Sequence, residues 1–323
     1  MSPSDGGPAD LPDGVGPGAP FGGLLLPDGV EPLVLDVAVG RLTALRARPR
    51  DEHGRPAAAR GTAVLVPGFT GSKEDFLELL PLLAARGWDA WAYSQRGQAD
   101  SARSPDDAGA GRGTGYLLPD LAADAVEVVR LVGGARPPEG AGRPGGPRPG
   151  VHLLGHSFGG VVARATALAA PELLADLVLL CSGPHGWLGR KADLPPRLAA
   201  AGGRSLWALD NPGLAERHPR DLEPLDAFLR ERSERTSTAA LLGAVAVLAD
   251  TADTTEDLAG TELPVLVAHG VDDDAWPQAW QRAMAERLGA RHEVVPGAGH
   301  LPNAENPAAT AALLDGFWGA GAS

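Results

Sequence analysis

The sequence predicts an α/β fold in which helices cover both faces of a mostly parallel central sheet. Short apolar runs, each long enough for one strand, alternate along the chain with segments of helical spacing, and this alternation is typical of parallel sheets. Of the 323 residues, 44% are hydrophobic, which is enough for a sizeable core. Residues 185–260 interrupt the alternation with helical patterns and no convincing strand. They predict a helical lid inserted between two strands.

The strands are expected where apolar, often β-branched residues form a short run that stops at glycine, proline or a polar turn. A hairpin at 33–39 and 42–47 opens the sheet, and the run 61–66, which stops at Pro67-Gly68, is the first buried parallel strand. Further strands are expected at 88–93, 151–154, 177–180, 265–268 and 292–295.

The helices are expected where apolar residues recur at helical spacing, as Phe76, Leu79, Leu80 and Leu83 do, or where small residues follow a strand directly. This pattern predicts helices at 73–86, 117–132, 158–170, 277–288 and 307–318.

Composition sets the expected domain boundaries. Residues 1–30 contain Gly, Pro and Asp with few apolar side chains, so we expect a disordered N-terminal tail. Residues 133–150 are dense in Gly, Pro and Arg and are expected to form a surface insertion that buries nothing. The sheet core is then made of residues 31–184 and 261–323, with the lid at 185–260 between them.

Charge and cysteine content limit the classes of binding partner and the cellular compartment that we expect. With 28 basic and 41 acidic side chains the net charge is −13, so we expect no nucleic-acid or membrane partner. The expected partner is a small-molecule substrate, as the motifs below indicate. Cys181 is the only cysteine and cannot form an intrachain disulfide. Because the chain shows no signal-peptide pattern and no run of about 18 apolar residues, we expect a cytoplasmic protein. The oligomeric state is not predicted.

A serine stands where a strand should turn sharply into a helix. The segment Gly155-His156-Ser157-Phe158-Gly159 follows an apolar run and precedes a helix of small residues. A serine on so tight a turn exposes its hydroxyl above the sheet, and glycines flank it because strand and helix nearly touch. The alternative is a phosphate-binding turn in which the serine has no role.

A nucleophilic serine requires a base and a carboxylate that orients the base. His300 lies in a glycine-rich loop directly after the last expected strand, which favours it over the other seven histidines. Asp272, Asp273 and Asp274 follow the preceding strand, and one of them is expected to orient the base. A solvated turn remains an alternative for this loop, whereas the oxygen-ligand spacing of an EF-hand is absent.

The oxyanion of an acyl-transfer reaction requires backbone donors. The N–H of Phe158, directly after the serine, is one candidate. The N–H of Phe69, in the glycine-rich loop after the strand at 61–66, is the other. A glycine-rich turn that merely enters a helix is the alternative for that loop.

These motifs resemble those of the α/β-hydrolase fold superfamily, in its lid-bearing serine hydrolase branch. The resemblance covers about residues 33–318 and rests on Gly68-Phe69-Thr70-Gly71, the stretch 95–101, the serine turn, Gly270-x-x-Asp273-x-x-x-Pro277 and Gly299-His300. In the family the acid stands three residues after that glycine, so the resemblance selects Asp273. It implies a triad of Ser157, His300 and Asp273.

The chain departs from the family pattern at two places. Pro67 stands where a histidine commonly precedes the oxyanion-loop glycine, and Ser94 and Ala99 replace the Asp and a Gly of the family's Asp-x-Arg-Gly-x-Gly-x-Ser stretch. A serine nucleophile at 157 argues against epoxide hydrolases and haloalkane dehalogenases, which attack with an aspartate at this position.

We therefore expect a metal-independent serine hydrolase that needs no cofactor and cleaves an ester-like acyl bond through an acyl-serine intermediate. The alternatives are the same triad acting on a thioester, an amide or in peroxyacid formation, and a non-catalytic ligand receptor built on the same fold. The high apolar content of the lid, with Trp187 and Trp207 as the expected substrate-binding residues, favours an apolar substrate group.

Overall fold

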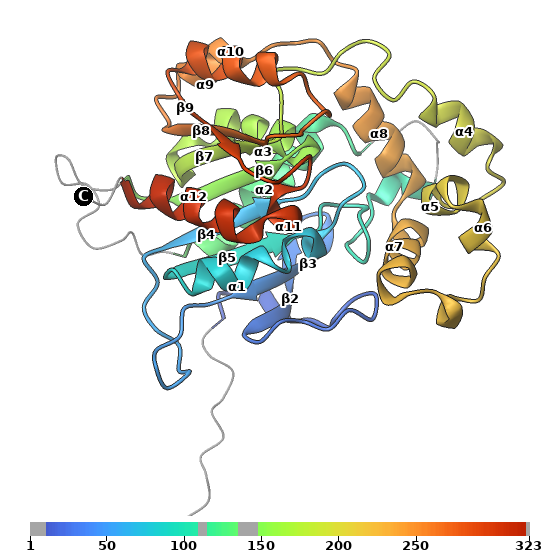
Figure 1. Ribbon diagram of the computed structural model, residues 1–323, viewed down its shortest axis with the longest axis horizontal. Coiled ribbons are helices and arrows are strands. Elements are labelled where there is room, and N and C mark those ends of the chain that lie inside the picture. The colour runs from blue at the N-terminus through green and yellow to red at the C-terminus, as the bar shows by residue number, and fades with distance from the viewer. Residues whose placement is uncertain (1–10, 109–114, 135–147, 321–323) are drawn as a thin grey trace, which may run out of the picture.

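A single nine-stranded sheet organises the protein (Figure 1). The computed structural model describes residues 11–108, 115–134 and 148–320. The strand order is β1-β2-β3-β5-β4-β6-β7-β8-β9, antiparallel from β1 to the β3–β5 pair and parallel from there to β9. The strands are β1 Val15–Pro17, β2 Val30–Val37, β3 Gly40–Ala47, β4 Gly61–Val66, β5 Trp88–Tyr93, β6 Val151–His156, β7 Leu174–Leu180, β8 Val265–Gly270 and β9 Arg291–Val295.

Helices cover both faces of the sheet, as the sequence predicts. In β4, Ala63 and Leu65 pack with the helices of one face, while Val64 and Val66 pack with those of the other. This explains the continuous apolar run of that strand, because both of its faces are buried. One face carries α1 Leu79–Ala84 and α12 Pro307–Ala320, and the other carries α2 Leu118–Gly133, α3 Phe158–Ala169 and α10 Gln278–Leu288.

The parallel register gathers the expected site at one edge of the sheet. Val66 pairs with Gly155, His156 with Leu180, and Leu180 with Ala268. The carboxyl ends of β4, β6, β7 and β8 therefore lie side by side. The loops that follow them meet above this edge, which is where ligands bind in open α/β sheets.

The prediction of a disordered tail over residues 1–30 is wrong for residues 11–30; residues 1–10 lie outside the described part. β1 pairs with β2, and Phe21 is buried against Phe228 of the helical insert and beneath the Lys73 ammonium group. The contacts that order this segment come from residues distant in sequence, so its local composition gave no sign of them.

Two other segments differ from the predictions. The helix expected at 73–86 is divided into a 3₁₀ turn, Lys73–Phe76, and α1, because Pro81 has no N–H to donate to the preceding turn. Most of the surface insertion expected at 133–150 lies outside the described residues.

Between β7 and β8 the chain forms a layer of helices, which we call the helical insert: α4 Leu194–Ala200, α5 Leu206–Asp210, α6 Pro212–Ala215, α7 Pro224–Arg235 and α8 Thr238–Leu248. It stands at one end of the sheet (Figure 1), whereas the short helix α9, Thr255–Ala259, lies beside α10 on the core. The insert is thus narrower than residues 185–260. No described helix combines the length and apolarity required to cross a bilayer.

Candidate active site

Ser157 lies on a strained turn between β6 and α3. Its φ of 55° and ψ of −119° are values that residues with a side chain rarely adopt. The turn is possible because the backbone around it is glycine: a Cβ on Gly155 would lie 2.2 Å from the carbonyl oxygen of Gly159, and one on Gly159 would lie 2.3 Å from that of Val66. Close packing of strand and helix therefore dictates this geometry.

The structure brings His300 and Asp273 to Ser157. Nε2 of His300 lies 2.9 Å from Oγ of Ser157, and Nδ1 lies 2.8 Å from Oδ1 of Asp273. The Asp273 side chain is fully buried, while that of His300 is 30% exposed. An imidazole held in this way can accept the serine proton at one nitrogen while the other donates to the carboxylate.

Asp273 is the one aspartate of its loop that is buried, since Asp272 and Asp274 are exposed. Burial alone would raise the pKa of Asp273, but hydrogen bonds and charge interactions outweigh it and lower that pKa below its usual value. The donors are His300, the N–H of Ala275 at 3.1 Å and Nε2 of Gln281 at 3.0 Å. The carboxylate therefore stays ionised where it faces the imidazole.

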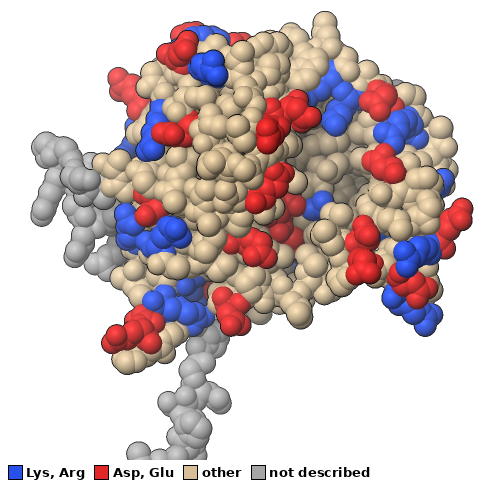
Figure 2. Space-filling view, in the orientation of Figure 1, with Lys and Arg blue, Asp and Glu red and all other residues tan. Residues whose placement is uncertain are grey.

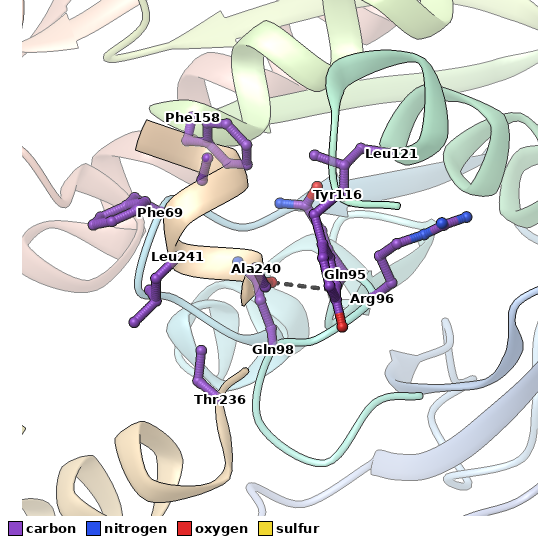
Figure 3. Close-up of a pocket in the computed structure, with 11 residues that line it drawn as sticks. Phe69, Gln95, Arg96, Gln98, Tyr116, Leu121, Phe158, Thr236, Ala240 and Leu241 are labelled. Carbon is purple, nitrogen blue, oxygen red and sulfur yellow. Dashed lines mark hydrogen bonds between the residues drawn. The ribbon is translucent and has the colours of Figure 1, made fainter. Parts of the chain in front are cut away.

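The two expected oxyanion donors belong to segments that adjoin the serine, since a Cβ on Gly68 would lie 3.4 Å from Cβ of Ser157. Phe158 is the first residue of α3, and the first N–H groups of a helix have no partner within it. The N–H of Phe69 makes no hydrogen bond to another described residue. Figure 3 shows both side chains beside a cavity of about 20 Å³ that Gln95 and Gln98 also line, which is room for about one water molecule rather than a substrate.

His156, to which the sequence gave no role, supports the loop that carries His300. Its Nε2 lies 2.7 Å from the carbonyl oxygen of His300, so Nε2 carries the hydrogen and donates. Burial, with the neighbouring His300 ring, lowers the pKa of His156 to about 4, which keeps it neutral near pH 7. The only signal in the sequence was its place beside the serine, because its partner lies 144 residues away.

The two tryptophans expected to bind substrate lie in different surroundings. Trp207 lines a cavity of about 160 Å³ together with Thr70, the neighbour of Phe69. Trp187 packs against Trp276 and Trp280 and does not line that cavity. Figure 2 shows a hollow between the helical insert and the core, with acidic side chains gathered along its core side.

Among the described residues, one group of three side chains has metal-ligand atoms within 4.8 Å of one another: His156, Cys181 and His300. Both nitrogens of His300 are already engaged by Ser157 and Asp273. Burial, assisted by the charge of Asp273, raises the pKa of the Cys181 thiol well above its usual value, so the thiol remains protonated. The group therefore fits a metal ion poorly.

Comparison with known proteins identifies the family. The model of the "Alpha/beta hydrolase family" matches residues 63–313. The chain belongs to the alpha/beta hydrolase family. Among curated relatives of this alpha/beta hydrolase, a protein of Variovorax paradoxus (strain S110) named "Putative carbamate hydrolase RutD" is 28% identical over 240 residues, which cover 71% of this chain and 81% of that protein.

Two further comparisons bear on the family. The pimeloyl-[acyl-carrier protein] methyl ester esterase of Aeromonas salmonicida (strain A449) is 31% identical over 172 residues, covering 48% of this chain and 65% of that protein. The solved structure of a thermophilic esterase from Thermogutta terrifontis superposes with a TM-score of 0.66 at 19% identity, over 91% of this chain and all of that chain. At that identity the structural likeness shows the fold alone.

Proposed function

We propose that this alpha/beta hydrolase cleaves a carboxylic ester-like acyl bond of a small substrate through an acyl-serine intermediate. The observation that carries the proposal is the continuous chain of hydrogen bonds from Ser157 through His300 to Asp273, 2.9 and 2.8 Å long. It starts at a serine on a strained turn, where the hydroxyl meets the N-terminus of α3. This arrangement activates a serine for attack.

Each side chain has a separate task in the proposed reaction. Oγ of Ser157 attacks the acyl carbon as Nε2 of His300 takes its proton. Asp273 keeps Nδ1 of His300 protonated and stabilises the imidazolium that forms. His300 then gives the proton to the leaving group, and water repeats the sequence on the acyl-serine. The N–H groups of Phe69 and Phe158 stabilise the negative oxygen in both steps.

The cavity beside Thr70 and Trp207 suggests the size of the group that binds there. A cavity of about 150 Å³ accepts benzene, so about 160 Å³ suits a short acyl or alcohol group. Apolar Leu206, Leu229 and Leu241 share its lining with polar residues that include one acidic and one basic side chain, Asp210 and Arg232. Acidic side chains line the core side of the hollow and a basic side chain lies within it (Figure 2), so neither an anionic nor a cationic substrate meets a surface of purely opposite charge. We therefore propose a neutral, short-chain substrate, with the helical insert as a lid over it and no macromolecular partner.

A second candidate function is cleavage of a carbamate or another C–N acyl bond, which the relatives named as carbamate hydrolases favour. The same triad could act on either bond, because both substrates form a tetrahedral adduct on the serine, from which the alcohol or the amine then leaves. The choice depends on protonation of the leaving group by His300.

The test is covalent labelling followed by a substrate panel. A fluorophosphonate probe should label Ser157, identified by peptide mass, and should fail to label the Ser157→Ala variant. The purified protein is then assayed with p-nitrophenyl esters of two to eight acyl carbons and with matched thioester, amide and carbamate analogues. Labelling without turnover of any analogue would favour the ligand-receptor alternative, and absence of labelling would refute the serine mechanism.

A further inference from the structure

Two glutamine side chains hold the backbone of the loop that carries Phe69. Nε2 of Gln98 donates to the carbonyl oxygen of Gly68 over 2.7 Å, and Nε2 of Gln95 donates to that of Pro67 over 3.0 Å. Both side chains are buried. The orientation of the Gln98 amide is fixed, because its Oε1 accepts the N–H of Gln95 at 3.0 Å (Figure 3) and only Nε2 is left to face Gly68.

The bond to Gly68 acts on the same peptide unit as the Phe69 N–H. The described chain has no cis peptide, so the C=O of Gly68 and the N–H of Phe69 point to opposite sides of one rigid plane. Fixing the carbonyl fixes the direction of that N–H. A hydrogen bond to the carbonyl oxygen also polarises the peptide and strengthens its N–H as a donor.

Gln98 holds the Gly68–Phe69 peptide from outside the loop to which that peptide belongs. Among the described residues, the N–H of Gly71 is the one other donor to the Gly68 carbonyl, at 3.2 Å in the same loop. The turn that carries Gln98 is itself held: Ala99 has a φ of 46°, and the carbonyl of Gly97 accepts the N–H of Ser237 at 2.8 Å. The side chain therefore extends from a fixed base.

We infer that Gln98 is a positioning residue of the oxyanion hole, because its amide aims the Phe69 N–H at the oxygen that becomes negative when Ser157 is acylated. The family stretch Asp-x-Arg-Gly-x-Gly-x-Ser specifies no residue at this position, so the role of Gln98 is inferred from its contacts alone. The inference rests on the proposed function, since it concerns the same reaction.

The experiment compares Gln98→Met with a matched control, Gln95→Met. Each substitution removes one buried amide donor to one loop carbonyl and keeps the length of the side chain. Gln98→Met also removes the acceptor of the Gln95 N–H. Gln95 holds the Pro67–Gly68 peptide, whose N–H is not an oxyanion donor. We expect thermal stability to fall in both variants, and further in Gln98→Met because the Gln95 N–H loses its acceptor. A fall in kcat of about tenfold or more is expected only in Gln98→Met, with KM within about twofold.

The affinity of a transition-state analogue distinguishes a positioning role of Gln98 from a purely structural one, because a purely structural role would leave that affinity unchanged. The affinity of a boronic acid, whose adduct on Ser157 places an oxygen in the hole, should fall in Gln98→Met by the same factor as kcat/KM. If Gln98→Met does not fold, the isosteric Gln98→Glu replaces it; its carboxylate repels the Gly68 carbonyl, and kcat should fall further.

The outcomes separate this inference from the proposed function. Equal losses of kcat in the Gln98 and Gln95 variants, or unchanged kcat and boronic acid affinity in the Gln98 variants, would overturn the positioning role while Ser157-dependent turnover of the unmodified protein still stands. Absence of that turnover in the unmodified protein would remove the proposed function and the inference together.

Discussion

The substitution Asp273→Asn distinguishes the charge of the orienting acid from its geometry. Within the described part of the chain, Oδ1 of Asp273 accepts from both His300 and the N–H of Ala275, whereas Oδ2 accepts only from Gln281. An asparagine should therefore place its carbonyl oxygen at the Oδ1 position and its NH2 group toward Gln281. Oε1 of Gln281 has no hydrogen-bond partner among the residues that the structure describes, so a rotation of that amide would give it one. The His300 tautomer would then be retained.

The expected loss follows from the charge that is removed. Where Asp→Asn also reverses the tautomer, kcat falls by about 10⁴. Here the loss is the attraction between carboxylate and imidazolium, about 4 kcal/mol for unit charges roughly 4 Å apart at an effective dielectric constant near 20. That corresponds to a fall in kcat/KM of roughly 10²- to 10³-fold for Asp273→Asn. Asp273→Ala, which loses charge and orientation, should fall by about 10⁴.

The assay is kcat/KM for p-nitrophenyl butyrate, with Asp272→Asn and Asp274→Asn as exposed controls that should stay within about twofold. Equal losses in Asp273→Asn and Asp273→Ala would refute the rotation of Gln281. A large loss in either control, with Asp273→Asn fully active, would refute the assignment of the acid.

Three further predictions concern the serine, the buried histidine and the cavity. Ser157→Ala should lower kcat/KM by at least about 10³-fold, and Ser157→Gly should be equally inactive. Ser157→Gly should also raise the free energy of unfolding by about 1 kcal/mol, because glycine relieves the strained φ. An unchanged urea midpoint for Ser157→Gly would contradict the strain. His156 binds its proton only near pH 4 when folded but near pH 6.5 when unfolded, so its stabilisation is present above pH 6.5 and lost as the pH falls toward 4. His156→Gln, which keeps the donor to His300, should remove about 3 kcal/mol of this pH dependence in urea unfolding at pH 4.5–7, and an unaltered profile would disprove it. For Trp207→Ala the preferred acyl chain should lengthen by about two carbons relative to the unmodified protein; a flat chain-length profile in both proteins would argue against an apolar contact.

The features that could be predicted from the sequence are those that depend on a local pattern of residues. Strands such as β4 and β8 lie inside the two cores, so they read as unbroken apolar runs. Ser157 and His300 could be proposed as partners because glycines surround each of them and their chain order matched a known arrangement. The choice of Asp273 among three aspartates required the family resemblance, since burial of one and exposure of its neighbours depends on tertiary packing.

What escaped prediction depends on contacts between distant residues. Gln98 acts on Gly68 and His156 acts on His300, and neither relation leaves a periodic trace in the sequence. Trp187 and Trp207 looked alike as bulky aromatic residues of the insert, yet one packs against Trp276 and Trp280 and the other lines a cavity. The sequence shows the chemistry of each side chain, but it does not show which residues surround that side chain in the fold.

The ordered segment that precedes β2 has a practical consequence for trimming the protein. By composition it invites removal, but a version beginning at Val30 would leave Leu33–Leu35 of β2 as an unpaired sheet edge. It would also expose Phe228, which is only 3% accessible, on α7, the helix whose Leu229 and Ser233 line the cavity beside Thr70. Bare edges and exposed aromatic rings promote self-association. A shortened version should therefore begin before residue 11, and purification tags are better placed at the opposite terminus.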